Sequence, residues 1–304
     1  MIGKILKISA ASIAAISFVN AQSFDAQAKK DQEALIKYFL KKFKDPAKHP
    51  EFFPYTPKEE LEKNFYKNLK FEDFRLGSYA YAKSSRAQYE EIVEMPPYED
   101  AIDEGEELYK NYKFKDGKGF KDCFKDPAIR GEYPKFDTKK NEVVTLSVAI
   151  NNCLKAHGEK PWNLYKGKMA KLKAYFAAAS KEAKKKINIK IPTKEAAQAY
   201  ERGKEIYYSQ RGYLKLSCAN CHVQGSGSRV RAEYLSPLLG AVTHFPVYRL
   251  KWQGVGTIER RIKGCEKNQG EKPHKGDSKW VRELIYFMTY MSNNLPVDGP
   301  DVRK

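Results

Sequence analysis

Cys218-Ala219-Asn220-Cys221-His222 forms a C-x-x-C-H motif. This motif restricts the fold more than any other feature, because it marks covalent attachment of a c-type heme. The two thiols can add to the two vinyl groups of one heme, and the adjacent imidazole then faces the iron. A C-x-x-C pair can also belong to a thioredoxin-like βαβ unit, or to a zinc site with a second Cys/His pair. The sequence offers neither context, so we predict a heme c bound by Cys218, Cys221 and His222.

The motif lies within an internal repeat. The pattern A-x3-G-x2-[LI]-Y occurs twice, with a constant offset of 98 residues. Its three- and four-residue steps place the side chains on one face of a helix. The same offset relates Cys123 to Cys221, so the repeat continues into a cysteine and indicates two related halves. The first copy consists of Ala101, Gly105, Leu108 and Tyr109, and the second of Ala199, Gly203, Ile206 and Tyr207.

The first half lacks the residues that would attach a heme. Phe120 stands where the second half has Cys218, and Phe124 stands where it has His222. We therefore expect the first half to bind no heme, which leaves one heme per chain.

The start of the chain predicts export. Lys4 and Lys7 precede an apolar run over residues 8–19, and Ala21 ends a small-residue cleavage site. This pattern is typical of a secretory signal peptide over residues 1–21. A membrane anchor is the alternative, but the run is shorter than the ~20 residues that a spanning helix needs. We expect a periplasmic protein with no membrane span in its mature chain.

The chain is strongly basic, with 56 Lys and Arg against 38 Asp and Glu and a formal net charge of +18. Removing the two lysines of the signal peptide would leave +16. Clustered basic residues can indicate nucleic-acid binding, but no recognised binding motif accompanies them here. We therefore expect no nucleic-acid partner.

These features together predict a mainly α protein with two cytochrome c-like domains in tandem. The heme-free domain would span residues 98–187 and the heme-binding domain residues 188–304. The preceding residues 22–97 hold six prolines and many polar residues, which indicates an N-terminal extension that wraps around the domains. Thr193 is the predicted N-cap of the helix that carries the second copy of the repeat.

The chain has five cysteines, of which the heme motif uses two. Cys123 and Cys153 would share an oxidising compartment, which favours a disulfide, and two buried free thiols are the alternative. Cys265 then remains. Arg260 and Arg261 precede it, and nearby positive charge favours a thiolate.

The Cys265 thiolate could ligate the iron opposite His222. Methionine is the usual sixth ligand of cytochromes c, so Met288 and Met291 are alternatives, as are His244 and His274. We favour Cys265 because of its cationic surroundings.

Several longer strings resemble the SoxA family, the larger heme subunits of the SoxAX cytochromes of periplasmic thiosulfate oxidation. The resemblance extends over most of the mature chain. It is carried by Met95-Pro96-Pro97, Thr145-Leu146, Ile150-Asn151-Asn152-Cys153, Ser217 to Val223, Arg231-Ala232-Glu233, Thr243 to Arg249, Arg261-x3-Cys265 and Val297 to Arg303.

The resemblance implies an L-cysteine S-thiosulfotransferase that oxidatively conjugates thiosulfate to a cysteine of the carrier protein SoxYZ. Electrons would leave through heme to the small heme subunit SoxX. The family implies that Cys265 is the catalytic, sulfur-modified iron ligand and that Arg261 holds the anionic substrate. Many members have a second C-x-x-C-H motif, whereas Cys123 and Cys153 here resemble members with a disulfide in its place. A plain electron-transfer cytochrome with an inert Cys265 is the rival hypothesis.

Overall fold

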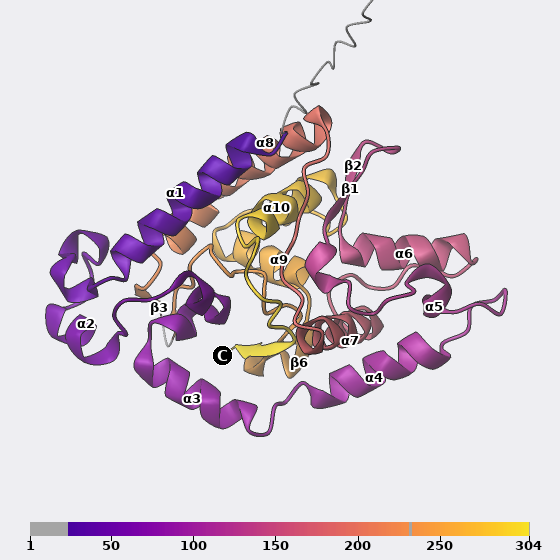
Figure 1. Cartoon of the computed structure of the whole chain (residues 1–304), viewed down its shortest axis with the longest axis horizontal. Coiled ribbons are helices and arrows are strands. Elements are labelled where there is room, and N and C mark those ends of the chain that lie inside the picture. The colour runs from indigo at the N-terminus through magenta and orange to yellow at the C-terminus, as the bar shows by residue number, and fades with distance from the viewer. Residues whose placement is uncertain (1–23, 231–232, 304) are drawn as a thin grey trace, which may run out of the picture.

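A computed structural model describes residues 24–230 and 233–303 of the chain (Figure 1). The predicted signal peptide, residues 1–21, lies outside the described residues. Within the described ranges, no helix is long and apolar enough to cross a membrane. The fold is mainly helical, with only short strands, as the sequence predicts.

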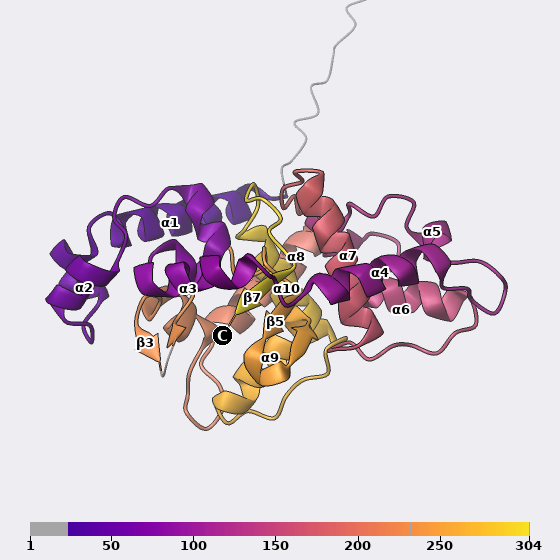
Figure 2. The same cartoon turned by 90° about the horizontal axis from the view of Figure 1, so that it is seen from below.

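The first half, which we expect to bind no heme and call the heme-free half, lies at one end of the molecule and has its own hydrophobic core (Figures 1 and 2). Its long helices α4 and α7 pack against each other, and α6 adds a third side to this core. The elements are α4 (Glu99–Asn111), α5 (Phe120–Cys123), β1 (Lys135–Asp137), β2 (Glu142–Val144), α6 (Leu146–Ala156) and α7 (Lys168–Glu182).

The second half occupies the centre of the molecule and repeats this order (Figures 1 and 2). Helix α8 packs against α10, as α4 packs against α7. Thr193 caps α8 as predicted, because its hydroxyl accepts a hydrogen bond from the amide of Ala196. The elements are α8 (Lys194–Tyr208), a π-helical turn (Asn220–Gln224), β3 (Arg229–Val230), β4 (Glu233–Tyr234), β5 (Val247–Arg249), β6 (Gly254–Gly256), α9 (Ile258–Asn268), α10 (Lys279–Tyr290) and β7 (Asp301–Arg303).

The structure extends the repeat beyond the pattern that the sequence analysis found. After the first cysteine, the offset between equivalent residues changes from 98 to 112. The hairpin β1–β2 then matches β5–β6 in register, with Lys135 opposite Val144 and Val247 opposite Gly256. The 14 additional residues of the second half fall in the segment that contains β3 and β4.

The two helix crossings depend on the repeated glycines. At Gly203 a side-chain methyl would overlap the backbone carbonyl of Glu283, and at Gly105 it would overlap that of Lys171. Both carbonyls belong to the partner helix, and Glu283 and Lys171 are related by the offset of 112. The backbones therefore cross in direct contact in both halves, which explains the glycine of the pattern.

The N-terminal extension wraps along the second half and also builds part of its core. It contains α1 (Ala26–Lys42), α2 (Lys58–Asn64) and α3 (Lys83–Val93). Helix α1 lies beside α8, and Asp31 accepts hydrogen bonds from Tyr200 (2.9 Å) and Lys204 (2.6 Å). The buried aromatic rings of the extension join the core of the second half, so the extension does more than wrap around the domains. These rings belong to Phe39, Phe43, Phe53, Phe65, Phe74 and Tyr81.

The predicted borders between the three segments fall in connections between helices. The border at residues 97 and 98 lies between α3 and α4, and that at 187 and 188 lies between α7 and α8. We retain these borders as proposed domain limits.

We expect Gly203→Ala and Gly105→Ala each to lower the free energy of unfolding by about 1–3 kcal/mol, because the added methyl forces the crossing helices apart. Gly264→Ala is the matched control, since Gly264 lies within α9 and a methyl there meets no atom within 4 Å. Alanine at that position should stabilise the helix by roughly 0.5–1 kcal/mol. Denaturant titration followed by circular dichroism measures all three. Wild-type stability of both crossing variants would contradict the close contact.

Candidate functional site

The C-x-x-C-H segment is held by a reciprocal cap at its first turn. The hydroxyl of Ser217 accepts a hydrogen bond from the amide of Asn220 (3.1 Å). In return, the side-chain oxygen of Asn220 accepts bonds from the Ser217 amide (2.8 Å) and hydroxyl (2.9 Å). Both cysteines thus lie on one helical turn, and the turn continues into His222.

The imidazole of His222 has a fixed orientation. Its Nδ1 lies 2.8 Å from the carbonyl oxygen of Ser236, which can only accept a hydrogen bond. Nδ1 therefore donates to this oxygen, and Nε2 is the ring nitrogen left to face other partners. This arrangement is typical of metal-ligating histidines, whose second ring nitrogen is bound by a neighbouring group.

Helix α9 brings Cys265 to His222. The hydroxyl of Thr257 caps the first turn of α9 by accepting a hydrogen bond from the amide of Arg260. Two turns further on, the thiol of Cys265 lies within hydrogen-bonding reach of the His222 side chain. The residue predicted from its cationic neighbours is therefore next to the heme motif.

The electrostatic surroundings of Cys265 favour a thiolate. Burial raises the pKa of this thiol, but Arg261, His222 and Arg249 lower it, and the net result is a pKa of about 7. Burial raises the pKa of Cys218 to about 12, and burial also raises the pKa of Cys221. At neutral pH the thiol form predominates for the two cysteines of the motif, whereas about half of Cys265 is thiolate, the form that acts as nucleophile and metal ligand.

Arg249 is a residue of this site that the sequence analysis did not identify. It ends the Thr243–Arg249 string, and its charge interacts with those of Arg261 and Cys265. The string itself was the available signal, but nothing in its residue types places it beside α9.

The other candidates for the distal position have different surroundings. Met291 is 1% exposed and lies in the main hydrophobic core, and Met288 packs against that core. Nδ1 of His274 lies 2.6 Å from Oε1 of Glu266, and the imidazole stacks on the ring of Trp280 with the centroids 4.0 Å apart. His244 is buried beside Phe245, and burial holds its pKa well below the usual range. For Cys265, in contrast, the interaction with the His222 side chain lowers the pKa of the thiol.

The donor set fits a heme. It consists of two thiols on one turn, an imidazole with a free Nε2, and a thiolate that faces this imidazole. The hydroxyl of Tyr207 supports the fit, because it is buried without a hydrogen-bond partner among the described residues. Its equivalent in the other half, Tyr109, donates to the carbonyl of Phe124 (2.8 Å). Among the described residues, the tyrosine hydroxyl thus has a hydrogen-bond partner in the half with Phe124 and lacks one in the half with His222.

The equivalent space of the first half is closed by a disulfide and aromatic rings. Cys123 and Cys153 form the predicted disulfide, with their Cα atoms 6.1 Å apart. By the two offsets, Cys123 is the equivalent of Cys221 and Cys153 that of Cys265. The bridge thus joins the two positions that, in the second half, would lie on either side of a heme plane. Phe120 is fully buried there against Tyr112, Phe114 and Trp162.

Two other clusters have side chains of metal-binding type. In one, His157 lies near Cys123 and Cys153, but these two sulfurs are bonded to each other. In the other, Glu266, Glu271 and His274 lie together, and Arg211 pairs with Glu271 there. Arg211 offsets the charge of Glu271, and His274 lies on Glu266.

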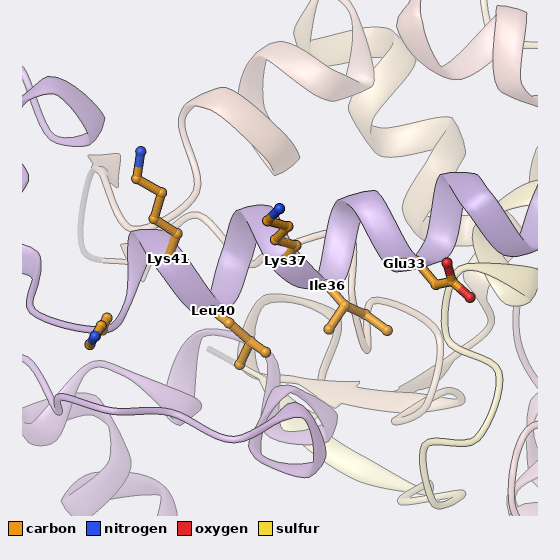
Figure 3. A pocket seen from close by; sticks show the side chains of 6 residues that line it. Glu33, Ile36, Lys37, Leu40 and Lys41 are labelled. Carbon is orange, nitrogen blue, oxygen red and sulfur yellow. The ribbon is translucent and has the colours of Figure 1, made fainter.

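A surface depression on α1 lacks the chemistry of a reactive site (Figure 3). Ile36 and Leu40 point to one side of the helix there, while Lys37 and Lys41 point to the other. Glu33 and Lys44 complete the lining, so it contains no thiol or imidazole.

Comparisons with known proteins agree with this geometry. The family model for the SoxA/TsdA cytochrome c domain matches residues 104–184 and 202–297. The L-cysteine S-thiosulfotransferase subunit SoxA of Chlorobaculum thiosulfatiphilum is 47% identical over 237 residues, covering 78% of this chain and 82% of that protein. The subunit of the same name from Allochromatium vinosum is 42% identical over 256 residues, covering 82% and 91%.

A solved structure shares the fold. It is described as the crystal structure of SoxXA from P. pantotrophus, and it superposes with a TM-score of 0.63 at 28% sequence identity. The match covers 69% of this chain and 79% of that chain.

We expect the double variant Cys123→Ser/Cys153→Ser to lose roughly 3–4 kcal/mol of stability, because a loop of 30 residues is then no longer closed in the unfolded chain. The visible heme spectrum should remain, since the second half has a separate core. Thermal unfolding with and without a reductant measures the loss. An unchanged midpoint in the double variant would contradict a stabilising role for the bridge.

Proposed function

The chain belongs to the SoxA/TsdA family of cytochromes c, and from this membership we propose how its own residues serve the reaction of an L-cysteine S-thiosulfotransferase. The protein has the role of a thiosulfate-oxidising cytochrome subunit, and its cytochrome c domain implies that it binds heme c. Its partner is the subunit SoxX. The reaction joins thiosulfate to a cysteine thiol of the carrier protein and releases one proton and two electrons.

We further propose that Cys218 and Cys221 would attach one heme covalently and that His222 and Cys265 would bind its iron. The fixed Nδ1 of His222 and the low pKa of Cys265 support these roles. When bound, the heme accepts electrons one at a time. Because the reaction releases two electrons, a second acceptor is required, and the SoxX subunit supplies it in this proposal.

The sulfur chemistry is assigned to Cys265. In a first step, its thiolate forms a sulfur–sulfur bond with the outer sulfur of thiosulfate, and two electrons leave. In a second step, the carrier thiolate attacks that outer sulfur, and Cys265 departs as a thiolate. A pKa near 7 suits both steps, because the thiolate is populated at neutral pH and a thiol of low pKa is a good leaving group.

Arg261 is assigned to the anionic end of the substrate. It lies one turn before Cys265 on α9, and its charge acts on the Cys265 thiol. A guanidinium can donate two parallel hydrogen bonds to sulfonate oxygens. The single observation that carries the proposal is the convergence of Cys265, His222 and Arg261.

We also propose that the protein acts in the periplasm after cleavage behind Ala21. The basic and apolar pattern of residues 1–21 supports this, as does a cofactor whose attachment motif occurs in exported cytochromes.

The intact mass of the mature protein tests attachment and export together. We expect a chain that starts at Gln22 and carries the mass of one heme and one disulfide. His222→Ala should keep the covalent heme but lose the low-spin spectrum, because the axial nitrogen is removed. Phe124→Leu, at the equivalent position of the other half, is the control and should leave the spectrum intact. A mass with two hemes, or with none, would refute the proposed attachment.

The role of Cys265 is tested by Cys265→Met. We expect a six-coordinate heme with a raised reduction potential, since thioether ligation favours ferrous iron relative to thiolate ligation. Thiosulfate-dependent turnover with the carrier protein should fall to background, because the methionine sulfur cannot form the required bond. Potentiometry and the turnover assay are run on the complex with SoxX. Retained turnover would leave an electron-transfer role for this heme and refute catalysis by Cys265.

A further inference from the structure

Arg249 ends β5 and has a charge partner from a different part of the chain. Its side chain is 9% exposed, and its Nη2 lies 3.2 Å from each carboxylate oxygen of Glu233 on β4. The Nε of Arg249 is buried and has no hydrogen-bond partner among the described residues. The Glu233 carboxylate therefore satisfies only part of the hydrogen-bond donors of the buried Arg249 guanidinium.

Arg249 lies at the entrance to α9. It pairs with Gly254 across β5 and β6, and β6 leads directly into the cap of α9 at Thr257. The ring of Trp252 lies near two guanidinium groups, at 5.7 Å from that of Arg249 and 4.3 Å from that of Arg260. The charge of Arg249 also acts on Arg261 and Cys265. The guanidinium groups of Arg249 and Arg261 and the thiol of Cys265 thus lie in one region.

The heme-free half shows that neither arginine is needed for the scaffold. By the offset of 112, the equivalent of Arg249 is Asp137 and that of Arg261 is Ala149. Asp137 accepts hydrogen bonds from backbone amides of the β1–β2 turn, and Ala149 lies within α6. The same hairpin and helix therefore form without cations at these positions. The two arginines occur only in the half whose cysteine is not in a disulfide.

Glu233 belongs to the additional segment that the heme-free half lacks. Its side chain is 39% exposed, unlike that of Arg249. Among the described residues, the strand that carries it spans Glu233–Tyr234 and pairs with β3. Moving this carboxylate into water costs little, because an exposed carboxylate already keeps much of its hydration.

We propose that Arg249 is a second anion-binding residue of the sulfur site, and that Glu233 occupies its guanidinium until the sulfonate of the substrate replaces the carboxylate. The exchange keeps one anion on the buried cation throughout, so no uncompensated charge is left in the protein interior. A sulfonate has three acceptor oxygens and can bind the Nη2 that Glu233 releases. Glu233 is then an internal competitor of the substrate. The inference rests on the proposed function, because it concerns the substrate of the same site.

The test compares Glu233→Gln with the wild type, both as the oxidised holoprotein in complex with SoxX. Sulfate, an unreactive tetrahedral oxyanion, is the calorimetric probe, and thiosulfate KM is measured separately. Removing the competing charge should tighten sulfate binding and lower KM by roughly two- to fivefold, the range of an exposed ion pair. Arg249→Lys should weaken sulfate binding by about tenfold or more, because the planar pair of donors is lost. Arg261→Ala is the reference for the loss of an anion-binding guanidinium.

Glu142→Gln is the matched control. A carboxylate oxygen of Glu142 lies 2.7 Å from Nη1 of Arg282. The side chains of Glu142 and Arg282 are 32% and 13% exposed, similar to those of Glu233 and Arg249. It lies on β2 of the heme-free half, so its loss should change neither sulfate binding nor KM. The heme spectrum of each variant reports that the site is folded.

Unchanged or weaker sulfate binding in Glu233→Gln would overturn the inference, because the pair would then only hold the β3–β4 hairpin in place. Wild-type sulfate affinity in Arg249→Lys would overturn it as well. The proposed function fails differently, namely when the wild-type complex shows no thiosulfate turnover. Sulfate binding does not require turnover, so the two failures are distinguishable.

Discussion

The buried ion pair of Lys173 and Glu259 joins α7 to the first turn of α9, the helix that carries Cys265. Lys173 on α7 donates to the Ser147 hydroxyl (2.7 Å) and to Glu259 (3.2 Å), and all three side chains are buried. Ser147 and Glu259 occupy equivalent positions in α6 and α9. One ammonium group therefore ties the first turns of both helices together. Loss of one partner from such a buried pair costs about 3–5 kcal/mol, because the other charge is left uncompensated in the interior.

The two halves show how one scaffold supports two different sites, a disulfide in the first half and the candidate heme site in the second. In each, a cysteine of a short helical segment lies near a cysteine on the helix that follows the hairpin. In the first half these cysteines bond directly, and Phe120 and Phe124 fill the remaining volume. In the second half His222 replaces one aromatic ring, and the Tyr207 hydroxyl loses the carbonyl that its equivalent binds. A few substitutions thus separate a closed, stabilised domain from one that can hold a planar cofactor.

The sequence was sufficient for the heme motif, the disulfide, the N-cap at Thr193 and the first part of the repeat. It did not reveal the second part, because the segment with β3 and β4 shifts the offset by 14 residues. Thr145 and Thr257, with Cys153 and Cys265, share the offset of 112, and this match would have placed Cys265 opposite the heme motif independently of its charged neighbours. The core of the N-terminal extension could not be predicted either. Its aromatic residues are spaced irregularly in the sequence and meet only in the folded chain, where Phe65 and Tyr81 also pack on Tyr234 of β4.

The reactivity of the site comes from local charges rather than from the net charge of the chain. All three cysteines of the second half lie in the same strongly basic protein, yet the pKa of Cys218 is about 12 and that of Cys265 about 7. Burial raises the pKa of both thiols, so burial does not explain the difference. Cys265 has Arg261, His222 and Arg249 as neighbours, whereas the charge of Cys265 itself further raises the pKa of Cys218. Because charges separated by more than about 8–10 Å are largely screened at physiological ionic strength, the remaining surface lysines cannot substitute for these three residues. The placement of two arginines beside α9 is therefore the step that converts a structural cysteine into a reactive one.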